Sequence, residues 1–212
     1  MIYSIVNTGS DGNATVIENI IMIDCGLSYK KIKPYVNKLQ LILLTHIHAD
    51  HFNKATIRKL TFERPTLRFG CCKWLVKDLI ECGVSEKNID VYDFENLYCY
   101  SSNLKVQPFE LHHDVLQCGY KIEINGYKVF YATDTCTLEG IVAKDYDYYF
   151  VEANYINEEE LHNRSVSEEY ENRVKKTHMN KEKTVNWLLE NMSDASKYEF
   201  MHQHKEKEVS KC

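Results

Sequence analysis

One short segment of the chain concentrates side chains that bind metal ions. It reads Thr45-His46-Ile47-His48-Ala49-Asp50-His51, with three histidines and one aspartate within six residues. Alternate residues of an extended segment point to the same side, so His46 and His48 can reach one ion. Asp50 and His51 can reach a second ion once the chain bends. Imidazole and carboxylate suit zinc, and also manganese or iron, so the segment predicts a transition-metal site with ligands for two ions.

The residues before this segment indicate how it is held. Residues 41–44 form a continuous apolar run, Leu-Ile-Leu-Leu, which predicts a strand buried on both faces. A loop that follows such a strand is anchored at one end, and its side chains can converge on one point. The alternative is a polar surface loop with incidental histidines.

The histidine motif resembles that of the metallo-β-lactamase fold hydrolases, and the resemblance extends over nearly the whole chain. It implies an α/β fold, a four-layer αββα sandwich of two mixed β-sheets with outer helices, in a single domain spanning residues 1–212. The strand at residues 20–26 resembles the one that ends in an acidic residue before the metal loop. Asp24 would then support the loop without binding metal, and a buried aspartate that caps a turn is the alternative.

The resemblance also implies the third ligand of the first ion. The segment Phe109-Glu110-Leu111-His112-His113-Asp114 ends a predicted strand and resembles the family's third histidine motif. It places His113 on the first ion with His46 and His48. His112 is the competing candidate.

Two later residues complete the second ion's ligands in the same comparison. Asp134 lies in Ala132-Thr133-Asp134-Thr135, which matches the family's Ala/Ser-x-Asp-Thr strand end, and it would bridge both ions. A plain aspartate at the end of a strand is the alternative. His202 follows a strand at residues 198–201 and would join Asp50, His51 and Asp134. His204 is a weaker candidate in a supporting role.

A further histidine resembles a feature of one branch of the family. Thr177-His178-Met179-Asn180 is similar to the His-x-Ser/Asn segment of the phosphodiesterase branch, which includes transfer-RNA 3′-end nucleases and smaller bacterial and phage relatives. The resemblance brings His178 close to the scissile phosphate; an exposed helix cap is the alternative. The Gly-rich turn at residues 8–13 also resembles small members of this branch. Glu152-Ala153-Asn154 precedes Tyr155 where many relatives have histidine, so this segment receives no catalytic role.

These observations predict a dinuclear metal-dependent hydrolase with two Zn²⁺ ions, or Mn²⁺ or Fe²⁺ in their place. We expect a phosphodiesterase that cleaves a small, possibly cyclic nucleotide or a nucleic acid end through a metal-bridging hydroxide. Asp50, Asp134 and His178 would carry the chemistry. One alternative is hydrolysis of a carboxylic ester, lactone or thioester at the same site. Another is a non-catalytic metal-binding scaffold protein.

The composition of the chain limits the kinds of binding partner that we expect. The 212 residues are 44% hydrophobic and 27% charged, which is typical of a globular protein. The net charge is −5, which argues against holding long polyanions by bulk charge and favours a short phosphodiester. No apolar run reaches the ~20 residues that cross a bilayer, and the first residues do not resemble a secretory signal. The eight cysteines form no Cys-x-x-Cys pair. We therefore expect reduced thiols in a cytoplasm, that of a bacterium or of a phage's host, no membrane partner, and a homodimer.

The remaining pattern predicts the elements that position these residues. The charged segment 157–176 is expected to be a solvated helix or a lid, with composition favouring a solvated surface. Strands are predicted at 2–6, 14–18, 20–24, 41–45, 66–69, 104–111, 120–124, 128–132, 148–151 and 198–201, and helices at 29–39, from 53, at 72–79 and at 185–192.

Overall fold

The computed structural model describes residues 1–164 and 166–203, and in this part of the chain two six-stranded sheets face each other. The first sheet holds six strands in sequence order: β1 (Tyr3–Asn7), β2 (Ala14–Ile17), β3 (Ile21–Ile23), β4 (Leu41–Leu43), β5 (Arg68–Cys72) and β6 (Ile89–Tyr92). The second holds β7 (Tyr98–Ser101), β8 (Leu104–Leu111), β9 (Gln117–Ile124), β10 (Tyr127–Ala132), β11 (Tyr148–Glu152) and β12 (Lys197–Met201).

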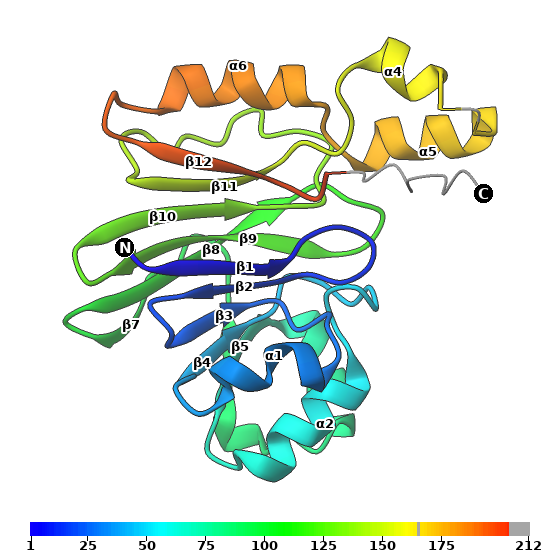
Figure 1. Ribbon diagram of the computed structural model, residues 1–212. Coiled ribbons are helices and arrows are strands. Elements are labelled where there is room, and N and C mark those ends of the chain that lie inside the picture. Colours follow the sequence, from blue (N-terminus) through cyan, green and yellow to red (C-terminus); the bar gives the residue numbers. More distant parts are fainter. Residues whose placement is uncertain (165, 204–212) are drawn as a thin grey trace.

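Helices cover the outer face of each sheet (Figure 1). On the first sheet these are α1 (Tyr29–Val36), α2 (Lys54–Glu63) and α3 (Val76–Glu81), with short 3₁₀ turns at Lys73–Leu75 and Glu86–Asn88. On the side of the second sheet lie α4 (Glu158–His162), α5 (Glu168–Thr177) and α6 (Lys181–Asn191). The expected four-layer αββα sandwich is therefore confirmed.

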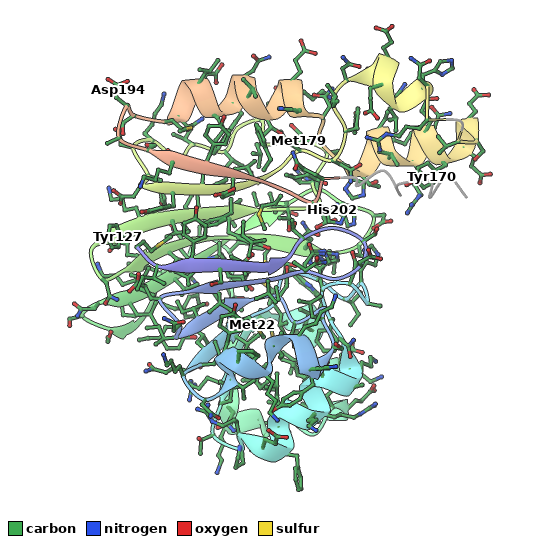
Figure 2. All side chains as sticks on the ribbon, viewed as in Figure 1. Met22, Tyr127, Tyr170, Met179, Asp194 and His202 are labelled. Carbon is green, nitrogen blue, oxygen red and sulfur yellow. The ribbon has the colours of Figure 1, made fainter. Side chains whose placement is uncertain are left out.

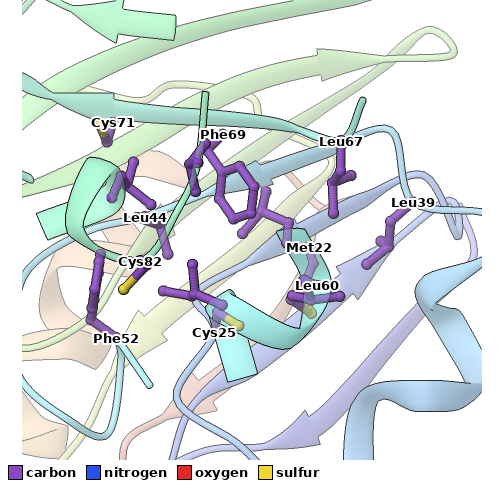
Figure 3. Packing of buried hydrophobic residues seen from close by; sticks show 14 of the residues in the cluster. Met22, Cys25, Leu39, Leu44, Phe52, Leu60, Leu67, Phe69, Cys71 and Cys82 are labelled. Atoms are coloured by element: carbon purple, nitrogen blue, oxygen red, sulfur yellow. The ribbon is translucent and has the colours of Figure 1, made fainter. Parts of the chain in front are cut away.

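The apolar run at residues 41–44 shows how the layers are held together. Leu41 and Leu43 face the second sheet, whereas Ile42 and Leu44 face the helices of the first. All four side chains are at most 1% exposed, so β4 is buried on both faces as predicted. Figure 3 shows the outer of these two cores, where Met22, Leu44 and Phe69 of the sheet meet Leu60 of α2.

Both sheets are mixed, and their strand directions bring the functional segments to one edge. β3, β4, β5 and β6 run parallel to one another. In the second sheet β8 and β10 are both antiparallel to β9, and β11 and β12 continue parallel to β10. The carboxyl ends of β3 and β4 therefore share one edge of their sheet, and those of β8, β10, β11 and β12 share one edge of theirs. Ligand sites in α/β sheets form at such ends.

Two strands were not predicted, and several boundaries differ. β6 and β7 are edge strands with partly exposed residues, Ile-Asp-Val-Tyr and Tyr-Cys-Tyr-Ser, so they lack the apolar pattern that burial imposes. The predicted helix 29–39 ends at Val36, with Pro34 inside it. The charged segment forms two helices instead of one, α4 and α5.

The remaining expectations concern the cysteines, membrane spans, domain organisation, oligomeric state and location. Of the seven cysteines in the described residues, all are free and five are buried. Within the same residues, none of the helices has the length and apolar character needed to cross a membrane. The single domain over 1–212, the homodimer and the cytoplasmic location stay predictions. His204 lies outside the described residues.

Candidate metal centre

The predicted site residues gather where five strands end. Asp24 follows β3, the segment 45–51 follows β4, and His113 lies two residues beyond β8. Asp134 lies two residues beyond β10, and His202 comes directly after β12. Figure 2 places His202 at this end of the sandwich, beside the helix that carries Tyr170. Asp24 and His202, which are 178 residues apart in sequence, are thus brought to the same end of the two sheets.

Three histidine nitrogens form the first donor group. Nδ1 of His48 lies 3.2 Å from Nε2 of His46 and 3.3 Å from Nε2 of His113. Nitrogens bound to one tetrahedral zinc ion at about 2.0–2.1 Å lie roughly 3.3–3.4 Å apart. The spacing of the three nitrogens therefore suits one zinc ion. His112 is exposed and lies outside this group.

The second donor group combines two carboxylates with two histidines. Nε2 of His51 lies 3.0 Å from Oδ2 of Asp134 and 3.7 Å from Oδ2 of Asp50. Nε2 of His202 lies 3.2 Å from Oδ1 of Asp134 and 3.6 Å from Oδ2 of Asp50. Asp134 also groups with His46 and His51, so its carboxylate stands between the two sets of donors.

Each of the five histidines has an outer partner on its other ring nitrogen. For His46 it is the Thr45 hydroxyl at 2.9 Å, and for His51 it is Oδ2 of Asp24 at 2.6 Å. The remaining three partners are the carbonyl of Thr177 for His113, the side-chain amide of Asn154 for His202, and Oδ1 of Asp114 for His48. Outer partners of this kind fix the ring orientation of metal-binding histidines and leave one nitrogen facing inward.

Two buried atoms lack the partner that a metal ion would supply. Oδ2 of Asp134 and Nε2 of His202 have no hydrogen bond, although both residues are at most 7% exposed. Their contacts at 3.0 and 3.2 Å are ion pairs without hydrogen-bond alignment. Buried polar atoms without partners are costly, so the donors fit a group that binds them together. The residues and their chemistry therefore fit a metal centre.

The electrostatics differ between the two groups. Burial, followed by the neighbouring His51, holds the pKa of His46 well below its usual value, so this ring is neutral and ready to bind metal. Burial also lowers the pKa of His51, but the carboxylates of Asp134 and Asp24 outweigh it and raise that pKa well above its usual value. Burial raises the pKa of the Asp134 carboxyl, but the neighbouring His202 and His51 outweigh this effect. The pKa of Asp134 is therefore well below its usual value. The second site is thus the more anionic one.

Backbone strain is concentrated at the ends of the strands. Asp24, Asp134 and His202 have φ values of 61°, 55° and 52°, in the left-handed region that residues with a side chain rarely adopt. Each of the three comes one or two residues after a strand, where the left-handed turn aims its side chain into the site. Strain of this kind persists where surrounding contacts impose it, and it clusters at functional sites.

The metal loop is packed against the Gly-rich turn that the sequence singled out. The backbone N–H of Asn13 donates to the carbonyl of Asp50 at 2.6 Å, and that of Cys25 donates to the carbonyl of His51 at 2.8 Å. Gly26 makes this approach possible, since a Cβ there would lie 1.7 Å from the Asp50 carbonyl oxygen. Asn13 also places its side-chain amide 2.8 Å from Nε2 of His51.

His178 forms a pair with a buried glutamate. Nδ1 of His178 donates to Oε1 of Glu152 at 2.5 Å, which is too short for two ligands of one ion and fits a charge-assisted hydrogen bond. Glu152 is fully buried and also accepts from the Thr135 backbone N–H at 2.7 Å. Burial lowers the pKa of His178, but the Glu152 carboxylate raises it more, and the net pKa is raised. The alternative of an exposed helix cap is excluded, because His178 is 8% exposed.

The family follows from comparison with known proteins. The family described as Beta-lactamase superfamily domain matches residues 19–202. This chain belongs to the beta-lactamase superfamily. No curated protein sequence matches it significantly.

Solved structures show which fold of that superfamily the chain has. The metallo-beta-lactamase fold protein YhfI from Bacillus subtilis is similar, with a TM-score of 0.73 at 15% identity over 97% of this chain and 87% of that one. Human tRNase Z, short form, has a TM-score of 0.68 at 15% identity over 96% and 93%. A diphosphatase from the PhnP family has a TM-score of 0.66 at 15% identity over 95% and 86%. At these identities the likeness shows the metallo-β-lactamase fold.

In this member of the superfamily the site opens into a cavity of about 240 Å³. Six of the predicted residues line it: His48, Asp50, His113, Asp134, His178 and His202. Tyr170, Arg173 and Val174 of α5 close one side. The charged segment was expected to be solvated, so its contribution to the cavity is a correction to that interpretation.

Glu152 is the functional residue that the sequence interpretation missed. The departure at Tyr155 led us to give the segment no role, yet Tyr155 is a buried core residue and Glu152 holds His178. The signal that could have found it was an acidic residue ending a buried strand, the same pattern that drew attention to Asp24.

Proposed function

We propose that this protein is a dinuclear metal-dependent phosphodiesterase. The observation that carries the proposal is the Glu152–His178 pair, whose histidine borders the same cavity as members of both donor groups. Nδ1 of His178 lies 3.8 Å from Oδ1 of Asp134, so the imidazole lies next to the residue that stands between the groups. A group that can hold a proton there suits a reaction with an oxygen leaving group.

The residues that would hold the ions follow from the geometry. His46, His48 and His113 would hold the first ion, Asp50, His51 and His202 the second, and Asp134 would touch both. Bound ions would supply positive charge for the phosphoryl oxygens and make water acidic enough to attack phosphorus near neutral pH. We propose zinc, because imidazole and carboxylate donors at this spacing suit it.

The chain's own residues would hold and move the proton. Glu152 accepts from Nδ1 and favours the protonated imidazole, which leaves Nε2–H of His178 for the substrate. That proton can go to the leaving oxygen as the phosphorus–oxygen bond breaks. A positioned general acid of this kind contributes about 10²–10⁴-fold to a rate.

Two further observations support a phosphate ester as substrate. Two of the similar structures described above are named as a tRNase and as a diphosphatase. The cavity of about 240 Å³ is below the roughly 300–1,000 Å³ of drug-sized pockets, which favours a small nucleotide or the end of a strand.

The test is hydrolysis by the zinc-loaded protein of bis(p-nitrophenyl) phosphate, cyclic nucleotides and short oligonucleotides, beside lactones, thioesters and a chromogenic β-lactam. We expect turnover of the phosphodiesters, and a loss of about 10²–10⁴-fold in His178→Ala. The exposed His112→Ala is the matched control and should keep both metal and activity. Turnover of the lactone or thioester alone would replace the proposal by the ester hydrolase alternative.

A further inference from the structure

Arg173 brings a permanent positive charge to the wall of the cavity. Among the described residues that line the cavity, Arg173 is the only lysine or arginine. Apart from Tyr170, the other ionisable groups there are carboxylates and histidines of the two donor groups, and His178. Its side chain is 57% exposed, so the guanidinium can be reached by a ligand that enters from solvent.

The position of Arg173 is fixed by the packing of helix α5 against its neighbours. Val174, the next residue, packs into a small core with Leu161 of α4 and Tyr155. Lys175 ties the two helices together through Glu158 at 2.6 Å. Ser167 caps the start of the helix, because its side chain accepts from the Tyr170 N–H.

Tyr170 also restrains the guanidinium itself. It lies one turn before Arg173 on α5, and its ring centre is 5.4 Å from the guanidinium carbon. This distance lies within the reach of a cation–π contact. Because Tyr170 borders the cavity too, the aromatic ring orients the charge along the cavity wall.

The charge lies beyond the metal-binding nitrogens, separated from them by one carboxylate. Oδ1 of Asp114 is 3.1 Å from Nε2 of His113, and Oδ2 of Asp114 is 4.0 Å from the nearest guanidinium nitrogen of Arg173. At 4.0 Å the two side chains form an ion pair without a hydrogen bond, so Asp114 does not use the N–H donors of the guanidinium. A group held by Arg173 would therefore sit next to the reacting phosphate and not at the same point.

We propose that Arg173 binds a second phosphate of the substrate, adjacent to the phosphodiester that reacts. The inference rests on the proposed function and specifies its substrate class: a nucleotide or strand end that carries a neighbouring phosphate. Guanidinium and phosphate match geometrically through paired hydrogen bonds, which lysine cannot form. Arg173 is thus a specificity residue at the cavity entrance.

Binding without turnover tests this site independently of catalysis. The affinities of thymidine 3′,5′-bisphosphate and thymidine 5′-monophosphate for the zinc-loaded protein are measured by titration calorimetry. The two probes differ by one phosphate. We expect the wild type to prefer the bisphosphate by about tenfold, Arg173→Met to lose most of that ratio, and Arg173→Lys to keep part of it.

Lys176→Met is the matched control, because Lys176 is exposed on the same helix and lies outside the cavity lining. It removes the same charge and should preserve the ratio. An unchanged ratio in Arg173→Met, an equal loss in Lys176→Met, or no preference in the wild type would each overturn the proposal. In parallel, thymidine 5′-(p-nitrophenyl phosphate) is assayed with and without a 3′-phosphate. If neither ester is hydrolysed while the binding ratio holds, the phosphodiesterase proposal fails and the Arg173 site stands.

Discussion

Replacing Asp24 by asparagine tests how the loop beneath the metal centre is held. Asp24 is fully buried, and its Oδ1 accepts from the backbone N–H and hydroxyl of Thr45 at 3.0 and 2.9 Å. Its Oδ2 lies 2.6 Å from Nδ1 of His51. Asparagine keeps the size but replaces one oxygen by an NH₂ group, which cannot accept. In either orientation of the amide, one buried donor of Thr45 or His51 then faces another donor.

The size of the effect follows from the contacts that are lost. A hydrogen bond to a charged group contributes about 1.5–3 kcal/mol. Because about 1.4 kcal/mol corresponds to a factor of ten, this equals roughly 10- to 150-fold. Changes in the outer partners of metal-binding histidines cost about 10- to 100-fold in affinity, which agrees. We therefore expect Asp24→Asn to weaken the second ion, the one next to His51, by about 10- to 100-fold.

Competition with a chromophoric zinc chelator measures both affinities. Asp194→Asn, an exposed change at the opposite end of β12, is the matched control and should leave both unchanged (Figure 2). If Asp24→Asn kept both ions with wild-type affinity, the proposed support of His51 would be refuted. Selective loss of the ion next to His46 and His48 would refute the assignment of His51 to the second ion.

Three further predictions concern proton transfer, packing and charge. Glu152→Gln should retain both ions by elemental analysis and lower kcat in the same direction as His178→Ala, because the amide no longer favours the protonated imidazole; loss of metal would contradict this. Gly26→Ala should lower both thermal stability and the content of the second ion, since its Cβ would overlap the Asp50 carbonyl, whereas Gly126→Ala, whose Cβ meets no atom within 4 Å, should leave the metal content unchanged. KM for a mononucleotide ester should change little between roughly 50 and 200 mM salt, because few phosphate charges are neutralised; a steep slope would indicate a basic groove.

Parts of the structure could be predicted because their causes are local. The run at residues 41–44 is apolar on both faces since β4 is covered on both sides. The apolar spacing at residues 185–192 predicted α6, which begins at Lys181 with the side chain of Asn180 accepting from the N–H of Lys183. The dense motif after β4 needs little more than a strand and a bend to bring its histidines together. Residue type and short spacing carry that information.

Other parts depend on contacts between distant segments. The pair of Glu152 and His178 joins the end of β11 to the end of α5, and nothing in either segment alone indicates the other. The exposure of His112 and the inward position of His113 depend on how the chain turns after β8. Arg173 belongs to a run of mixed charge, typical of a solvated surface, and only the packing of α5 beside the cavity distinguishes it from its neighbours.

The same limit applies to the strained turns. Asp24, Asp134 and His202 adopt left-handed backbone conformations for which glycine is the usual signal. Asp24 and Asp134 form ion pairs with His51, and His202 forms one with Asp134; these contacts impose the conformation. The resemblance predicted the residues, whereas the conformation that aims them became visible only in the structure.

Zinc titration of the metal-free protein tests the central claim most directly. The protein is freed of metal with a chelator, zinc is added in steps, and the initial rate of bis(p-nitrophenyl) phosphate hydrolysis is recorded at each step. Two donor groups that share Asp134 predict no activity without metal and a rate that levels off at two zinc ions per chain. A plateau at one ion per chain, or full activity in the metal-free protein, would contradict a dinuclear phosphodiesterase.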